Sequence, residues 1–317
     1  MQYQIDPRQR LDKEAARAMR EQCDRILRKI QRGRDAEAGF HATRKSIKRL
    51  RAALLLLSGS VPKKRWRPIY AELGGVARQL SPLRDLNVMT GSLAALGELA
   101  ADGHLDLALA VLRGCIRQRL TAAGQTLSRA ALGRVVETLE QIRRRLGALP
   151  LGKLRVRRIA AAAGASHDAA RTAMCEAYRS QDGLAFHDWR KHVQRHWRHM
   201  QLLAMAWPDE LGARQATASK IGQLIGQDHD LTTLRNFIDG DPQLARDPRM
   251  AAVLRLIDKR QGELRAAARP LGQHLLAERT GAFERRLRKH LKTARRHPDE
   301  PGLRIDLETR RACRLTS

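Results

Sequence analysis

The stretch that decides the fold runs from Phe40 to Leu57 and reads FHATRKSIKRLRAALLLL. On a helix, which turns about 100° per residue, its apolar and basic residues separate onto two faces. The apolar face consists of Ile47, Leu50, Leu54 and Leu57. The basic face consists of His41, Arg44, Lys45, Lys48 and Arg51, with Arg49 at its edge. No Asp or Glu lies in the stretch, although a solvated helix face usually interleaves opposite charges. We therefore expect a helix that packs on one side and binds an anion on the other.

The rest of the chain is rich in strong helix formers and lacks alternating β-branched runs, which predicts an all-α fold. In the first part we expect helices over Arg10–Arg32, Phe40–Leu57, Lys64–Leu80, Leu83–Ala100, Leu105–Ala131 and Leu132–Leu146. In the second part we expect them over Leu154–Arg179, Phe186–Ala206, Leu211–Ile225, Leu231–Ile238, Met250–Glu278 (kinked or split at Pro270) and Ala282–Arg296. Residues 298–317 are polar and predict a loosely held tail.

Two motifs of the first part recur in the second part. FHDWRK at Phe186–Lys191 matches FHATRK at Phe40–Lys45. HDLTTL at His229–Leu234 matches RDLNVM at Arg84–Met89, in the same order and at nearly the same separation. This repeat predicts two similar helical halves, residues 1–148 and 149–297, within one domain.

The second copy predicts a second basic face, formed by His187, Arg190, Lys191, Arg195 and Arg198. It is weaker than the first, because Gln194 replaces Lys48 and Trp197 replaces Arg51. Arg and Lys suit phosphate oxygens, so a pair of such faces favours anion binding over a solvated surface. Two further basic runs either extend one groove or only solubilise the protein. They comprise Lys153, Arg155, Arg157 and Arg158, and Arg285, Arg286, Arg288, Lys289, Lys292, Arg295 and Arg296.

Composition restricts the class of partner. Lys and Arg number 61 against 33 Asp and Glu, which gives a net charge of +28 and favours nucleic acid, inorganic polyanions or anionic membranes. Aromatic residues make up 3%, which counts against a protein that stacks single-stranded bases. The four cysteines are far apart, and the chain has no signal-like or membrane-spanning apolar run. We therefore expect a cytoplasmic protein with reduced thiols and no membrane span.

Several polar residues have both a structural and a functional interpretation. His41 and His187 either cap their helices or donate to a phosphate oxygen. Asp85 and Asp230 are expected to support a basic or His side chain of the preceding helix, with catalysis as the less favoured role.

The histidines at 192, 196 and 199 have helical spacing but no carboxylate or thiol at a ligand step, so we expect core or boundary residues rather than a metal site. The His-Asp dipeptides at 167, 187 and 229 match part of a phosphohydrolase signature, but not in its order. No phosphate-binding glycine loop, nucleophile motif or catalytic carboxylate pair is present. The sequence thus predicts no metal, no cofactor and no enzyme activity.

The combined pattern resembles the conserved histidine α-helical domain (CHAD) family. The resemblance rests on FHxxRKxxKRLRAALLLL with LxxLRDLxVM, followed by FHDWRKxVxRxW with GQDHDL, and covers about residues 8–297. It implies a helical bundle of two four-helix halves related by a pseudo-two-fold axis, with a basic central groove. Many members carry a CYTH-type hydrolase domain before this one, and the resemblance implies a stand-alone version here.

The resemblance also implies that this domain binds inorganic polyphosphate without catalysis and associates with polyphosphate granules. The implied contacts are His41, Arg44, Lys45, Lys48, Arg49, Arg51, His187, Arg190, Lys191, Arg195 and Arg198. To these we add Arg285, Arg288, Lys289 and Lys292 from the final basic run. Two alternatives stay open: a protein that binds nucleic acid non-specifically, and an enzyme that acts on phosphoanhydrides.

Overall fold

The computed structural model describes residues 3–32, 36–80, 84–100, 105–122 and 129–296. These residues form α-helices and short 3-10 turns, without a strand among them, so the all-α prediction is confirmed. The first six helices are α1 (Leu11–Arg32), α2 (Ala36–Leu57), α3 (Lys63–Gln79), α4 (Arg84–Leu99), α5 (Asp106–Ala122) and α6 (Arg129–Gly147). The other six are α7 (Val156–Ser180), α8 (Gly183–Leu202), α9 (Pro208–Asp239), α10 (Pro242–Arg246), α11 (Met250–Leu275) and α12 (Thr280–Arg296).

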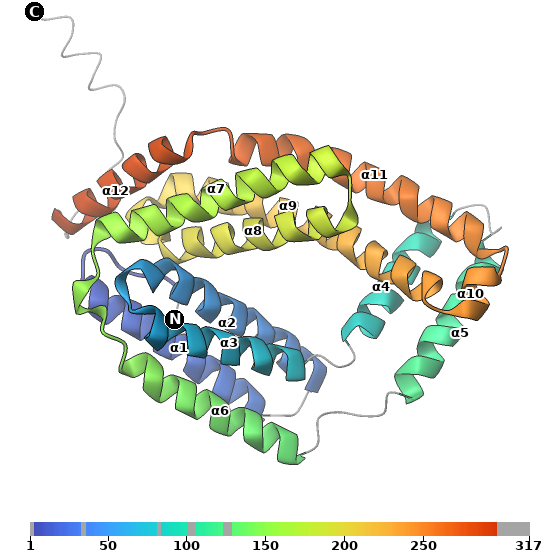
Figure 1. Ribbon diagram of the computed structural model, residues 1–317, viewed down its shortest axis with the longest axis horizontal. Helices are drawn as coiled ribbons and strands as arrows, with labels where there is room; N and C mark the ends of the chain where they lie inside the picture. Colours follow the sequence, from blue (N-terminus) through green and yellow to red (C-terminus); the bar gives the residue numbers. More distant parts are fainter. Residues whose placement is uncertain (1–2, 33–35, 81–83, 101–104, 123–128, 297–317) are drawn as a thin grey trace, which may run out of the picture.

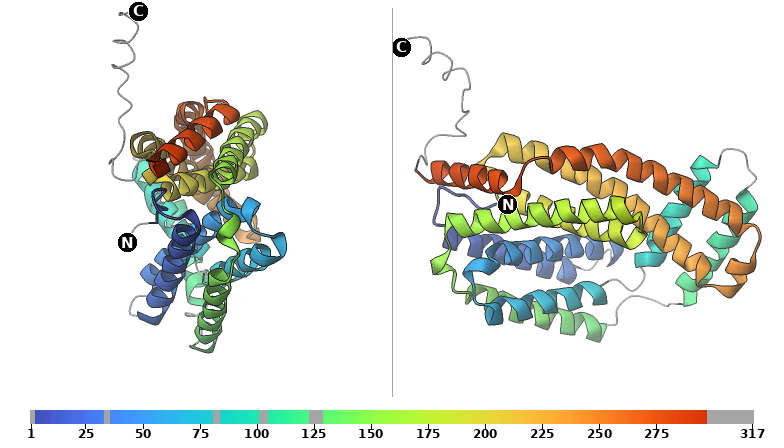
Figure 2. Two further views of the ribbon diagram at one scale, coloured as in Figure 1. Left: turned by 90° about the vertical axis from the view of Figure 1, so that its left-hand side faces the viewer. Right: turned by 45° about the horizontal axis from the view of Figure 1, so that its top comes forward.

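The helices form two neighbouring groups (Figures 1 and 2). In one group α1, α2, α3 and α6 pack around a common centre, and in the other α7, α8, α9, α11 and α12 do so. The groups meet where α2 packs against α7 and α8. Helices α4 and α5 lie apart from the first group and pack on α9 and α11. The two basic stretches of the sequence, on α2 and α8, are thereby brought side by side.

Each helix follows from its apolar spacing. On α1, Leu11, Ala15, Met19, Cys23 and Ile26 recur every three or four residues and are buried, while the opposite face is charged. Burial of each large side chain of this kind contributes about 1.5–3 kcal/mol.

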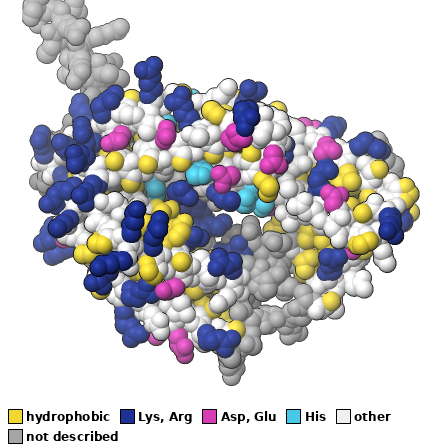
Figure 3. Space-filling view, in the orientation of Figure 1, with side chains coloured by type: hydrophobic (Ala, Val, Ile, Leu, Met, Phe, Trp, Pro, Cys, Tyr) yellow, Lys and Arg dark blue, Asp and Glu magenta, His cyan; other side chains and the backbone are white. Residues whose placement is uncertain are grey.

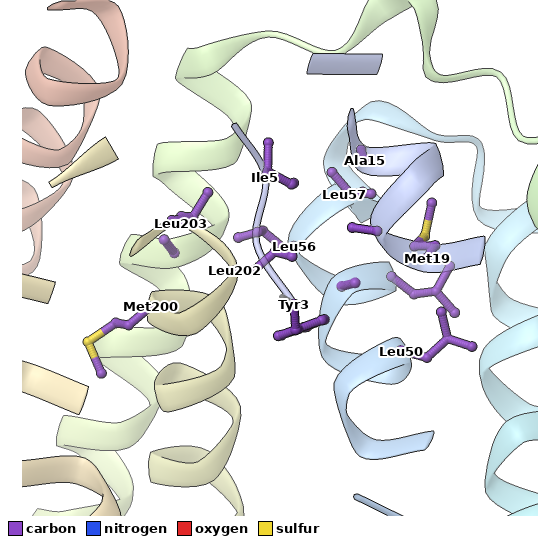
Figure 4. Packing of buried hydrophobic residues seen from close by; sticks show 14 of the residues in the cluster. Tyr3, Ile5, Ala15, Met19, Leu50, Leu56, Leu57, Met200, Leu202 and Leu203 are labelled. Atoms are coloured by element: carbon purple, nitrogen blue, oxygen red, sulfur yellow. The ribbon is translucent and has the colours of Figure 1, made fainter. Parts of the chain in front are cut away.

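The junction between the groups is closed by the N-terminal segment. Tyr3 and Ile5 lie between the end of α8 and the buried faces of α1 and α2 (Figure 4). The backbone N–H of Ile5 donates to the carbonyl of Leu202 at 2.8 Å, and the Tyr3 hydroxyl donates to the carbonyl of Arg49 at 2.6 Å. The N-terminal segment therefore connects α8 to α2 through one hydrogen bond to each helix.

Three expected helices differ from the structure. The helices expected over 211–225 and 231–238 are one continuous helix, α9, because the polar residue Asp228 occupies a core position between Ile225 and Leu231. Helix α2 begins at Ala36 rather than Phe40, since the Ala and Glu residues before Phe40 are good helix formers. Helix α11 continues through Pro270 and is not split.

The boundary between α5 and α6 also differs from expectation. Helix α5 ends at Ala122 and α6 begins at Arg129, where one helix was expected to reach residue 131. The expected tail, 298–317, lies outside the described residues.

Candidate functional site

The basic faces of α2 and α8 line a common pocket of about 350 Å³, with one side closed by α3. We call it the basic pocket. It is lined by Arg44, Lys48, Arg51, Ala52 and Leu55 of α2, Tyr70 of α3, and His187, Arg190, Lys191, Gln194, Arg195 and Arg198 of α8. In Figure 3, Lys and Arg side chains surround a hollow near the middle of the molecule, with His side chains beside it.

The lining of the basic pocket is strongly unbalanced in charge. Seven of its described lining residues are Lys or Arg, and none of those described residues is Asp or Glu. Like charges held this close repel each other, and the low-dielectric walls of a pocket strengthen that repulsion. An anion in the pocket would remove it.

Arg198 is a buried cation of the basic pocket. Its residue is 7% exposed, and its Nη1 donates to the carbonyl of Gln194 at 2.7 Å. Within the described part of the chain it forms no ion pair with a carboxylate. Burial lowers the pKa of Arg198 to about 10. Burial of a charge without a counter-ion costs several kcal/mol. A buried cation of this kind is typical of a site where a ligand supplies the counter-ion.

Arg51 is positioned by the third helix. Its guanidinium carbon lies 4.0 Å from the centre of the Tyr70 ring, a cation–π contact worth about 0.5–2 kcal/mol. The same group packs over Gly74 of α3, where a Cβ would lie 3.7 Å from it, an ordinary van der Waals contact. The contact with Tyr70 holds Arg51 at the wall of the basic pocket.

Helix α9 supports the α8 side of the basic pocket. A Cβ at Gly226 would lie 3.2 Å from Nη2 of Arg190, so the absence of a side chain there allows Arg190 to pass close to α9. The rings of His187 and His229 lie 3.8 Å apart and are tilted by 31°. His229 thus contacts the histidine that opens the second basic face.

The structure brings together most of the predicted binding residues. Arg44, Lys48, Arg51, His187, Arg190, Lys191, Arg195 and Arg198 all line the basic pocket. Lys45 is exposed outside the lining, and the Arg49 guanidinium lies 5.5 Å from the Tyr3 ring. The α12 residues Arg285, Arg288, Lys289 and Lys292 do not contribute to the lining.

Three further predictions concern the supporting residues. Asp230 is half-buried in a second pocket of about 480 Å³ that α4, α9 and α11 form. The side chains of His41 and Asp85 lie outside the described part of the structure.

Comparison with known protein families assigns the chain to a family. The family model described as CHAD domain matches residues 7–239. The chain belongs to the CHAD domain family. The matched region contains every residue of the basic pocket and ends with α9, so that α10, α11 and α12 follow it. No match was found among curated proteins, and none among solved structures.

This CHAD domain contains a buried ion pair that the sequence did not reveal. Asp228 is fully buried, and Arg265 of α11 donates from Nε to its Oδ1 at 2.7 Å. Burial raises the pKa of Asp228, while Arg265 opposes the rise. The pair lies on the same turn of α9 as His229 and fixes α9 against α11.

A polar cluster inside this CHAD domain connects its two helix groups. His199 donates from Nε2 to the carbonyl of Ala52 at 3.0 Å. The Ser166 hydroxyl donates to the carbonyl of Ala163 at 2.8 Å, and its oxygen lies 3.0 Å from Nδ1 of both His196 and His199. His167 stacks on Phe283 at 5.2 Å. Since Ala52 also lines the basic pocket, the cluster sets the position of α2 against α8.

The described residues of this CHAD domain form neither a metal site nor a membrane-spanning helix. Among the residues that the structure describes, no group of three or more His, Cys, Asp and Glu side chains could hold a metal ion. Within the same residues, every helix is too short or too polar to cross a membrane. The expectation of core histidines at 196 and 199 is confirmed, because both are buried.

Proposed function

We propose that this protein binds inorganic polyphosphate without catalysing its cleavage, and that the basic pocket is the centre of one continuous groove between its two halves. The observation that carries the proposal is the lining of the pocket, where α2 and α8 contribute seven cations and the described lining residues include no carboxylate. The buried guanidinium of Arg198 supports it, because such a group gains most from an anionic partner.

The shape of the lining favours a linear polyanion. The lining residues of α2 extend from Arg44 to Leu55, about 16 Å at the rise of an α-helix. A single phosphate would contact only a part of this length, whereas a chain of phosphates would follow it. A DNA duplex is too wide to enter a pocket of about 350 Å³.

The proposal of a non-catalytic role also rests on the lining. Among the described lining residues there is no carboxylate to act as a general base and no Ser, Thr or Cys to act as a nucleophile, and the imidazole of His187 is the one group of that lining with the usual chemistry of a general base. An enzyme would release phosphate from polyphosphate, and Asp230→Ala or Asp85→Ala would abolish this release. We propose that the wild-type protein releases no phosphate above background, so that neither substitution changes the measured rate.

We further propose a cytoplasmic location at polyphosphate granules, as expected of a protein that binds their main component. A fluorescent fusion that stays dispersed in cells with granules would contradict this part.

The direct test is the double variant Arg44→Gln, Lys48→Gln. Loss of two cations from the lining should raise the Kd for long-chain polyphosphate about 10- to 100-fold, equivalent to about 1.4–2.8 kcal/mol. By analogy with counterion release from DNA, the slope of log K against log salt should become about 1.5 units shallower.

The matched control is Arg255→Gln, Lys259→Gln. It removes the same residue types at the same spacing, from exposed positions on α11 that do not line the basic pocket. Both proteins should unfold at the wild-type urea midpoint. Equal losses of affinity in the two variants would mean that binding follows total charge and that the pocket is not the site.

A further inference from the structure

Helix α12 carries a second basic surface that the basic pocket does not include. Arg285, Lys289, Lys292 and Arg296 are exposed and lie on one face, because they are four, three and four residues apart. The opposite face buries Phe283, Leu287 and Leu291 in the main core. Because one face of α12 is packed in the core, its basic face points to solvent along the whole helix.

The start of α7 adds cations to this surface. Helices α7 and α12 pack side by side and run antiparallel (Figures 1 and 2). Thr280, at the start of α12, donates to Asp168 at 2.9 Å, so the end of α12 lies toward the start of α7. There Arg155, Arg157 and Arg158 are exposed. Figure 3 shows Lys and Arg side chains gathered at this end of the molecule. Apart from Arg286, the exposed cations of these two segments form what we call the α12 patch: Lys153, Arg155, Arg157, Arg158, Arg285, Lys289, Lys292, Arg295 and Arg296.

The α12 patch lacks acidic partners, although a neighbouring cation has them. Arg286 lies beside the patch and pairs with Glu278 at 2.6 Å and with Glu210 at 3.8 Å. In contrast, no patch cation forms an ion pair with a carboxylate of the described residues. The sequence has no Asp or Glu within 153–167 or within 285–296. Glu278 and Glu210 thus neutralise Arg286, whereas the patch cations form no ion pair with a described carboxylate, although Glu284 directly precedes Arg285 in the sequence.

The chemistry of the α12 patch suits a linear inorganic anion. The large exposed hydrophobic side chains of the described part are Leu99, Leu107 and Leu184, and none belongs to the patch. The Trp207 ring is covered by His290 at 4.2 Å and by Arg286 at 4.9 Å, and Phe283 of α12 is buried. Among the described residues, the patch therefore offers no exposed Phe, Tyr or Trp ring on which a base could stack and no large apolar group for insertion into lipid.

We propose that the α12 patch is a second polyphosphate site, which binds another segment of the chain held in the basic pocket. The inference rests on the proposed function and adds a chain-length preference to it. Short chains fill the pocket alone. A long chain occupies both sites, and the second contact is then intramolecular, which raises its affinity by about 10-fold or more.

The test compares two triple variants of the full chain. Arg285→Gln, Lys289→Gln, Arg296→Gln changes the patch. Arg113→Gln, Arg117→Gln, Lys259→Gln is the control, with the same residue types at exposed positions on α5 and α11. Binding of tripolyphosphate, long-chain polyphosphate and duplex DNA is measured at one salt concentration.

We expect the patch variant to keep its affinity for tripolyphosphate and to bind long-chain polyphosphate about 10-fold more weakly. The control variant should keep most of its affinity for both ligands. Equal losses in patch and control variants would overturn the inference. An equal patch-dependent loss for duplex DNA would also overturn it, since the patch would then be a nucleic-acid surface.

The pocket variant Arg44→Gln, Lys48→Gln separates this inference from the proposed function. If long-chain affinity falls in the pocket variant but not in the patch variant, the α12 patch is not a site and the proposed function stands. If it falls in the patch variant alone, the pocket is not the site and the patch remains one.

Discussion

Mild acid should destabilise this protein through three histidines buried between α7 and α8. His167, His196 and His199 are each at most 2% exposed. Burial lowers the pKa of His167 and of His199 to about 4, and it lowers the pKa of His196 well below its usual value. Nearby arginines add to the effect, with Arg214 acting on His167 and His196. The folded protein therefore keeps all three rings neutral at pH 5.

The size of the effect follows from proton linkage. In the unfolded chain a histidine titrates near pH 6.5, so below this pH the unfolded state binds protons that the folded state does not. Each such group lowers the free energy of unfolding by about 1.4 kcal/mol per pH unit, until the pH reaches the folded pKa. At pH 5 His167 and His199 together remove about 4 kcal/mol, a large part of the roughly 5–15 kcal/mol of a typical domain. Above pH 6.5 these groups contribute no pH dependence.

Urea unfolding at pH 7, 6 and 5, followed by circular dichroism, measures this loss. His167→Phe is the informative variant, because neither ring nitrogen of His167 has a hydrogen-bond partner among the described residues and the ring already stacks on Phe283. It should reduce the loss between pH 7 and 5 by about 2 kcal/mol. His274→Gln, at an exposed position, should leave the loss unchanged. The same pH dependence in wild type and His167→Phe would refute the reasoning.

Two further predictions concern the packing of α11 against its neighbours. Arg265→Met leaves the carboxylate of Asp228 buried without its partner and should lower the free energy of unfolding, measured with urea, by about 3–5 kcal/mol. A loss below about 1 kcal/mol would mean that the pair is solvated. Gly272→Ala places a Cβ 2.7 Å from Trp189 and should lower stability by about 1–3 kcal/mol in thermal unfolding, whereas the control Gly114→Ala on α5, where a Cβ meets nothing within 4 Å, should not destabilise.

The sequence predicted the helices whose apolar spacing is regular, and it failed where a polar residue takes a core position. α1 and α3 match their expected ranges within one residue. α9 was expected as two helices, because Asp228 interrupts the apolar pattern, and the partner that makes its burial possible, Arg265, lies 37 residues further along the chain. A window of local sequence does not contain that information.

The candidate site was predictable to a similar extent. The basic faces of α2 and α8 were visible as periodic cations without acids, and eight of the predicted residues line the pocket. Tyr70 was missed because no motif links α3 to the basic face of α2. Arg198 was expected as an exposed cation of the polar face, but the packing of α8 buries it. Both outcomes depend on how helices pack, which periodicity within one helix does not specify.

The central claim, that this CHAD domain selects polyphosphate, is tested most directly by a competition titration. Labelled long-chain polyphosphate is bound to the full chain at near-physiological salt and displaced with unlabelled polyphosphate or with duplex DNA at equal phosphate concentration. We predict that polyphosphate displaces the label at a concentration at least about 10-fold lower than DNA does, because only a thin chain reaches the cations inside the basic pocket. Equal displacement by the two polymers would contradict the claim and indicate binding by surface charge alone.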